Sequence, residues 1–213
     1  MAFILIAINL MLGLLAGDYN GGSAQLREKV QARELARKDR RTQPAELEKL
    51  TADLDAARLE FEPVRKRTAW HRLIGILAAL VGILVQCIAV TYFIGTARWC
   101  KEVVEAYGFE QDFVGRSASL KRKAFPWSLL GILTLLGIVS LGAAADPATL
   151  RSTTADWVVP HFWAAMLGTA VVVYCLIQQA DKIHQNNGLV REITDAVTAE
   201  RQRRGLDTAP AAT

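Results

Sequence analysis

The chain has 213 residues, of which 52% are hydrophobic, and its mean hydropathy is positive. Lysine and arginine number 25 against 21 acidic residues, and this small excess is spread along the chain without a dense basic block. Nucleic acid is therefore not an expected partner. The three cysteines lack metal-ligand spacing, so neither a zinc site nor a disulfide framework is expected.

The N-terminal segment, residues 1–17, carries no charged side chain. A secretory signal normally opens with a basic region and ends at a small-residue cleavage site, and neither feature is present. We therefore predict a short first transmembrane helix over residues 2–17. A cleaved signal or an uncleaved anchor is the alternative interpretation.

The next segment, residues 18–70, is rich in charge and predicts a helical hairpin outside the membrane. Pro44 suits the first turn of a helix, so we expect two antiparallel helices at residues 23–41 and 44–69. Pro63 should kink the second of them before it enters the membrane. Apolar residues recur at alternating spacings of three and four in the second helix, which is typical of a coiled-coil seam. They are Leu47, Leu50, Leu54, Ala57, Phe61 and Val64, with a weaker stripe of Leu26, Val30 and Leu35 in the first helix.

Three later stretches run for more than twenty residues without an acidic or strongly basic side chain. A helix needs roughly 20 apolar residues to cross a bilayer, so these stretches predict transmembrane helices at residues 72–96, 125–145 and 158–180. All five tryptophans lie near the ends of these spans, as expected for residues at the membrane interface. A polar connection at residues 98–123 separates the first two spans and contains a short helix that ends at Gly108.

The expected fold class is all-α: a polytopic, four-transmembrane-helix bundle with an extramembrane antiparallel coiled-coil hairpin. The expected regions are a first transmembrane helix at 1–17, the hairpin at 18–70, a three-helix transmembrane region at 71–181, and a tail at 182–213. The tail combines an amphipathic helix with a disordered C-terminus. The expected location is a lipid bilayer, most simply the bacterial inner membrane, with the hairpin on the cytoplasmic side.

Two histidines are the best candidates for a cofactor site. His71 and His161 each lie near the N-terminal end of a predicted span, and these two spans run in the same direction. Both imidazoles therefore fall on the hairpin side at similar depth, where they could ligate a haem b iron from its two faces. Arg65, Arg67 and Arg72 could pair with the propionates. The alternative is that both histidines lie at the interface without a cofactor.

Small and amide residues within the spans predict helix packing. One face of the second span carries Gly75, Ala79, Gly82 and Gln86, and the fourth span carries Ala164 and Gly168. Asn9 and Gln86 are expected to share an interhelical hydrogen bond. No charged residue lies centrally in a span, which argues against a proton pump or a secondary transporter.

The order of a first span, a charged hairpin and a second span resembles the layout of Oxa1-superfamily membrane insertases. The resemblance concerns layout and no residue motif, and it implies a role in membrane insertion. No nucleotide-binding loop, zinc motif or nucleophile elbow is present, so no enzymatic activity is expected. The sequence favours a non-catalytic scaffold or accessory subunit that docks a protein partner, or self-associates, through residues 23–69. The alternatives are a haem b electron-transfer subunit and an insertase.

Overall fold

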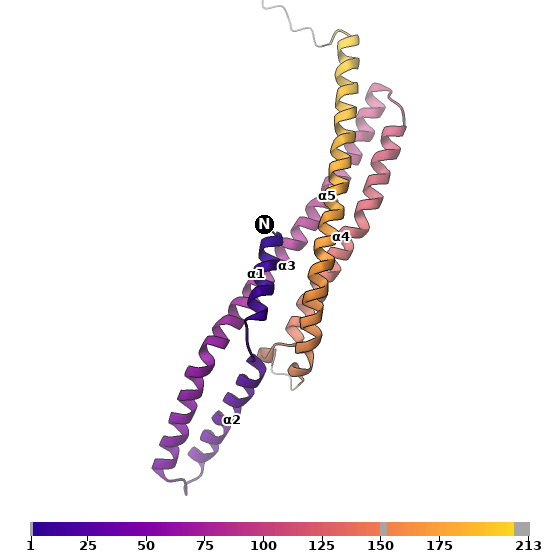
Figure 1. Cartoon of the computed structure of the whole chain (residues 1–213). Coiled ribbons are helices and arrows are strands. Elements are labelled where there is room, and N and C mark those ends of the chain that lie inside the picture. The colour runs from indigo at the N-terminus through magenta and orange to yellow at the C-terminus, as the bar shows by residue number, and fades with distance from the viewer. Residues whose placement is uncertain (1, 150–152, 207–213) are drawn as a thin grey trace, which may run out of the picture. The chain divides into compact units, whose positions relative to one another are not determined.

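The computed structural model describes residues 2–149 and 153–206, and every regular element there is helical (Figure 1). The helices are α1 (Ala2–Leu14), α2 (Tyr19–Lys38), α3 (Pro44–Tyr107), α4 (Asp112–Ala144) and α5 (Val158–Arg203), with short 3₁₀ turns η1 (Pro147–Thr149) and η2 (Thr154–Trp157). The all-α class is therefore confirmed.

Three helical segments are long and apolar enough to cross a membrane. They are Pro44–Tyr107, Asp112–Ala144 and Thr154–Arg203. Helices α1 and α2 pass the same test only as a pair, and a 50° bend separates them. The described chain thus has three helices long and apolar enough to span a membrane, or four if the bent pair is one span, as expected for an integral membrane protein.

The chain forms two compact units. The first unit comprises Met1–Val81 and Leu136–Thr169, and the second comprises Gly82–Leu135 and Ala170–Thr213. Helices α3, α4 and α5 each contribute residues to both units.

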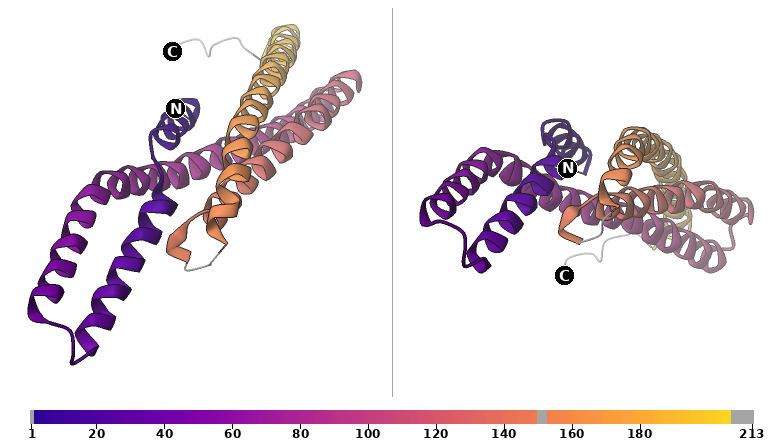
Figure 2. Two further views of the ribbon diagram at one scale, coloured as in Figure 1. Left: turned by 60° about the horizontal axis from the view of Figure 1, so that its bottom comes forward. Right: turned by 90° about the horizontal axis from the view of Figure 1, so that it is seen from below.

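In the first unit, α2 and the beginning of α3 run antiparallel and side by side (Figures 1 and 2). Gly17, with φ of +79°, turns the chain after α1, and Asp18 caps α2 by accepting a hydrogen bond from the Gly21 amide at 2.8 Å. Helix α2 ends at Lys38, and Pro44 opens α3 as predicted. The second hairpin helix runs on into the predicted span without interruption, and α3 ends only at Tyr107.

The apolar seam of α3 lies on the inner side of this hairpin. Leu54 is fully buried, and the other five seam residues are half-buried. The Phe61 ring lies 5.2 Å from the Tyr19 ring of α2. The expected stripe on α2 is wrong at Leu35, which is 70% exposed, whereas Arg33 is partly buried.

In the second unit, α3, α4 and α5 share a small core. Cys100 and Val104 of α3 pack with Leu189 and Ile193 of α5, all at 3% exposure or less. Gly108, with φ of +72°, ends α3 at the predicted residue. Residues 98–123 are helical except at 108–111, so this stretch extends α3 and α4 rather than forming a loop.

The tail differs from the prediction in its continuity. Residues 182–203 belong to α5 and do not form a separate helix. This stretch is nevertheless amphipathic as predicted, because Leu189 and Ile193 are buried and Val197 packs against the same cluster. The expected disorder of the last residues, 207–213, lies outside the described residues.

Candidate functional site

The two predicted histidines come together in the first unit. His71 lies on α3 and His161 in the first turn of α5. Their ring centroids are 6.3 Å apart, and the ring planes are inclined at 61°. Helices α1 and α4 supply the surfaces against which the two rings pack.

His71 is held by a backbone contact with α1. Its Nδ1 atom lies 3.1 Å from the carbonyl oxygen of Asn9. Because a carbonyl only accepts hydrogen bonds, Nδ1 must carry the proton, and Nε2 of a neutral ring is left as an acceptor. Gly13, one helical turn after Asn9, makes room for the ring, since a Cβ atom there would stand 2.9 Å from His71 Cε1.

His161 repeats this arrangement on α4. A Cβ atom at Gly142 would stand 3.0 Å from His161 Cε1. The backbone of Ile138, one helical turn before Gly142, lies beside the ring, while Nδ1 is buried without a hydrogen bond of ordinary geometry. Each imidazole therefore packs directly against a glycine of a neighbouring helix, in space that a side chain there would fill.

Polar contacts surround the histidine pair. Arg72 Nη1 lies 2.6 Å from Asp146 Oδ2, and the Arg72 guanidinium lies over the Tyr19 ring. Arg67 donates to the carbonyl of Leu15 at 3.2 Å. Asp146 therefore neutralises Arg72, one of the three arginines that could pair with a haem propionate.

Two hydrogen bonds connect α2 to the segment between α4 and α5. Asn20 Nδ2 donates to the carbonyl of Ala145 at 3.3 Å, and Thr154 Oγ1 donates to Asn20 Oδ1 at 3.0 Å. Thr154 is buried. These contacts fix the beginning of the hairpin within the first unit.

The predicted small residues lie at close helix contacts. A Cβ atom at Gly75 would stand 3.1 Å from Asn9 Nδ2, so this glycine lets α1 approach α3. A Cβ atom at Gly82 would stand 2.8 Å from Leu135 Cδ1 in the second unit. Among the remaining candidates, Ala79 and Gly168 are buried and Ala164 is half-buried.

Gln86 has a different partner from the predicted one. It is fully buried in the second unit, where Gln179 Nε2 donates both to Gln86 Oε1 and, at 2.8 Å, to Ser128 Oγ. Gly131 provides the space for the Gln86 amide, since a Cβ atom there would overlap it. The expected bond between Asn9 and Gln86 is wrong, because Asn9 packs on Gly75 instead.

A neighbouring cluster was not predicted. Asn186, 1% exposed, donates to Tyr92 Oη at 3.0 Å and to Thr96 Oγ1 at 3.1 Å, and Tyr92 donates to Asn187 Oδ1 at 2.5 Å. The sequence Asn186-Asn187-Gly188 is typical of a helix end, which hides the position of these asparagines in the interior of α5. Their spacing from Gln179, two helical turns in a single helix, is the signal that could have revealed them.

No cluster of three or more histidine, cysteine or acidic side chains suited to a metal ion occurs in residues 2–149 and 153–206. Burial raises the pKa of the Cys100 thiol, which disfavours a reactive thiolate. Comparisons with known proteins give no match: no protein-family model, no curated protein and no solved structure matches the chain.

Proposed function

We propose that this protein is a non-catalytic membrane scaffold or accessory subunit whose coiled hairpin, residues 19–69, docks a helical segment of a protein partner. The observation that carries the proposal is the incomplete cover of the apolar seam near the tip of the hairpin. A seam of this spacing forms stable structure when a second apolar helix packs on it. Helix α2 supplies such cover only near its beginning.

The residues of α2 that face the α3 seam are apolar at the base of the hairpin and charged near its tip. Leu26 and Val30 of α2 are half-buried, but the inner face of α2 then continues through Arg33. Leu47 and Leu50, near the tip, are half-buried, as are the seam residues nearer the base apart from the buried Leu54. The apolar seam is therefore longer than the apolar face that α2 offers it.

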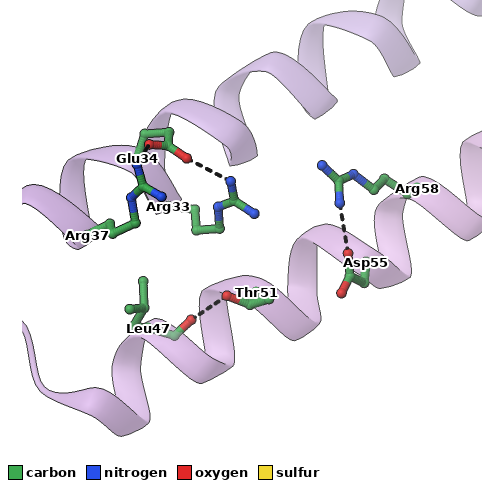
Figure 3. A network of polar contacts seen from close by, with 7 residues as sticks. All are labelled: Arg33, Glu34, Arg37, Leu47, Thr51, Asp55 and Arg58. Atoms are coloured by element: carbon green, nitrogen blue, oxygen red, sulfur yellow. Dashed lines mark hydrogen bonds and ion pairs between the residues drawn. The ribbon is translucent and has the colours of Figure 1, made fainter.

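Polar contacts near the tip do not join the two helices among the residues drawn in Figure 3. Arg33 pairs with Glu34 of its own helix at 2.7 Å, and Arg58 pairs with Asp55 of its own helix at 3.0 Å. Thr51 Oγ1 likewise donates to the Leu47 carbonyl, at 2.8 Å. The Nε atom of Arg33 is buried without a hydrogen-bond partner, so this charged side chain is an imperfect cover for an apolar seam.

A shallow groove of about 510 Å³ lies beside the seam on α3, and Leu47 is the one seam residue that lines it. Leu47, Ala52 and the methyl group of Thr51 contribute its apolar lining, and Glu48 and Asp55 give it an acidic rim. The lining suits an apolar side chain from a helix whose flanking residues are basic.

Site-specific photo-crosslinking in native membranes tests the proposal. A photoreactive residue at Leu47 should give one discrete crosslinked product, and the same residue at Leu59, which is 71% exposed and off the seam, should give none. A product of twice the chain mass identifies self-association as the form of docking. Equal labelling from both positions, or no product from Leu47, would disprove docking on the seam, and a broad set of nascent chains would favour the insertase.

We further propose that α1 is a fourth membrane-embedded helix, which completes the four-helix bundle. Its contacts at Asn9 and Gly13 place it beside residues 71–75 of α3, where the apolar stretch of α3 begins. The side chains that α1 turns outward are apolar: Phe3, Ile4, Ile8 and Met11 are 44–58% exposed. In a bilayer such side chains face lipid.

A haem b electron-transfer subunit is the second candidate, because the spacing of the two imidazoles favours it. Two imidazoles bound trans to one metal ion, with bonds of about 2 Å, place their ring centroids roughly 6.4 Å apart. The observed separation is 6.3 Å, a value that an ordinary edge-to-face contact between two rings also gives. The Nδ1 bond from His71 to Asn9 is the second-sphere contact that leaves Nε2 free as a ligand.

An absorption spectrum of protein extracted in mild detergent decides between the two candidates. Haem bound by the pair should give a Soret band that His71→Ala and His161→Ala each abolish. His184→Ala, which alters an exposed histidine elsewhere on α5, should leave the band unchanged. Protein without a Soret band leaves the scaffold as the proposed function.

A further inference from the structure

The second unit contains a groove between α3 and α4 with a volume of about 380 Å³. Val90 and Ile94 of α3 and Phe125 of α4 form apolar walls, and Lys121 and Arg122 lie at its edge. Its lining is thus apolar over most of its length and cationic at one end.

The two cations at the edge lack partners. Lys121 and Arg122 are exposed, and neither makes an ion pair or a side-chain hydrogen bond with any residue that the structure describes. The preceding cation on the same helix behaves differently, since Arg116 pairs with Glu192 at 2.7 Å. The groove therefore carries two uncompensated positive charges at its rim.

The position of the groove along its helices matches the layers of a bilayer. Ile94 lies in the last turn of one predicted span, and Phe125 opens the next. Lys121 and Arg122 precede Phe125 by four and three residues, which places them about 6 Å and about 4.5 Å further out along α4. Trp127, on the same helix, is the type of residue that lies at the interface. Along the helices, from outside the membrane inwards, the lining of the groove changes from cationic to apolar. A phospholipid changes from phosphate to acyl chain in the same order.

We propose that this groove binds one anionic phospholipid of the surrounding bilayer. Its acyl chain packs against Val90, Ile94 and Phe125, and its phosphate contacts Lys121 and Arg122. Basic pockets between transmembrane helices are suited to anionic head groups. A zwitterionic lipid fits less well, because its own cation would face two protein cations at short range.

Native mass spectrometry of the purified full chain in detergent tests the proposal, with phosphatidylglycerol and phosphatidylcholine as probes. The wild-type protein should retain phosphatidylglycerol preferentially. The double variant Lys121→Gln with Arg122→Gln should bind it about 5- to 30-fold more weakly, as expected for two cations near a membrane surface, with phosphatidylcholine binding unchanged.

Lys123→Gln is the matched control, because Lys123 is an exposed cation on the same helix that does not line the groove. It should change phosphatidylglycerol binding by less than about twofold. Ile94→Trp, at an exposed wall position, should fill the groove and weaken lipid binding without any change in charge. Circular dichroism confirms that each variant retains its helical content.

Three results would overturn the site. Lys123→Gln could weaken binding as much as the double variant, which would show general surface attraction. Phosphatidylcholine could be retained as well as phosphatidylglycerol, which would remove the role of the cations. Ile94→Trp could leave binding unchanged, which would place the lipid elsewhere.

Discussion

Glycines on α1 and α4 determine where the two imidazoles lie, because each ring occupies space that a side chain on the neighbouring helix would otherwise fill. The sequence indicated that His71 and His161 share a side of the membrane, since that follows from helix direction alone. It did not indicate Gly13 or Gly142 as their supports. Such contacts depend on the rotation of each helix about its axis, which a nearly uniform apolar span does not specify.

At this scale we predict that Gly142→Ala displaces the His161 ring and destabilises the first unit by about 1–3 kcal/mol, as overpacking usually does. The new methyl carbon would stand 3.0 Å from His161 Cε1. Gly137→Ala is the matched control on the same helix, because nothing lies within 4 Å of a Cβ atom there. Thermal unfolding in detergent and the imidazole NMR shifts measure the difference, and equal behaviour of the two variants would contradict the packing described.

A second residue-scale prediction concerns the amide pair. Gln86→Leu should destabilise the second unit by about 0.5–2 kcal/mol, because Gln179 loses one of its two acceptors in an environment without water. The double variant Gln86→Leu with Gln179→Leu should cost less than the sum of the single variants. A double-mutant cycle from unfolding titrations measures this coupling, with Cys87→Ala, at an exposed position on the same helix, as the control. Strictly additive losses would rule out the bond.

At the scale of elements, the sequence predicted where helices begin and where they turn better than where they continue. Pro44 and Gly108 carry local backbone preferences, and both mark helix ends in the structure. The continuation of α3 to Tyr107 and of α5 to Arg203 was missed because the change from apolar to polar residues after each span was interpreted as a change of element. Hydropathy reports the solvent around a helix, whereas a helix ends only where its backbone hydrogen bonding is interrupted.

For the hairpin we predict that Leu54→Ala lowers its free energy of opening by about 2–5 kcal/mol, the usual cost of truncating a buried leucine. Leu54 has 0% exposure, whereas Leu59 on the same helix is 71% exposed. Leu59→Ala should therefore stay within about 0.5 kcal/mol of the wild type. Hydrogen exchange of the α2 amides measures both variants. Unchanged protection in Leu54→Ala would mean that α2 does not pack on the seam.

The end of α5 should respond to acid. Hydrogen bonds from Arg203 and Arg204 lower the pKa of Glu200 from 4.5 to about 2. Because the pKa of Glu200 is lower in the folded helix than in the unfolded chain, the ionised carboxylate stabilises the helix end at any pH above about 4.5. This stabilisation is lost as the pH falls from about 4.5 towards 2. NMR or hydrogen exchange of residues 196–204 should show fraying in that window, less sharply at high salt. Glu200→Gln should fray at neutral pH and show no such transition.

At the scale of the whole chain, the apolar stretches predicted a polytopic helical membrane protein because the bilayer imposes one requirement on every span. Its core is about 30 Å thick, and backbone groups inside it must be paired within the helix. The number of spans is harder to predict, because α1 is at the limit of that requirement. Its 13 residues rise only about 20 Å.

The position of the N-terminus decides that number. If α1 crosses, the N-terminus and the end of α5 lie on the same side of the membrane, opposite the hairpin; if it does not, the N-terminus stays on the hairpin side. We predict crossing, because a helix with apolar outward side chains lies beside the beginning of the apolar stretch of α3. Local thinning of the bilayer costs only fractions of a kcal/mol per Å, so a short helix can be accommodated.

Protease protection of epitope tags in sealed vesicles of both orientations tests whether α1 crosses the membrane, with a tag in the 39–43 turn as the reference for the hairpin side. An N-terminal tag cleaved together with the tag at 39–43 would establish three spans, and the histidine pair would then be shielded by a helix that enters the membrane without crossing it.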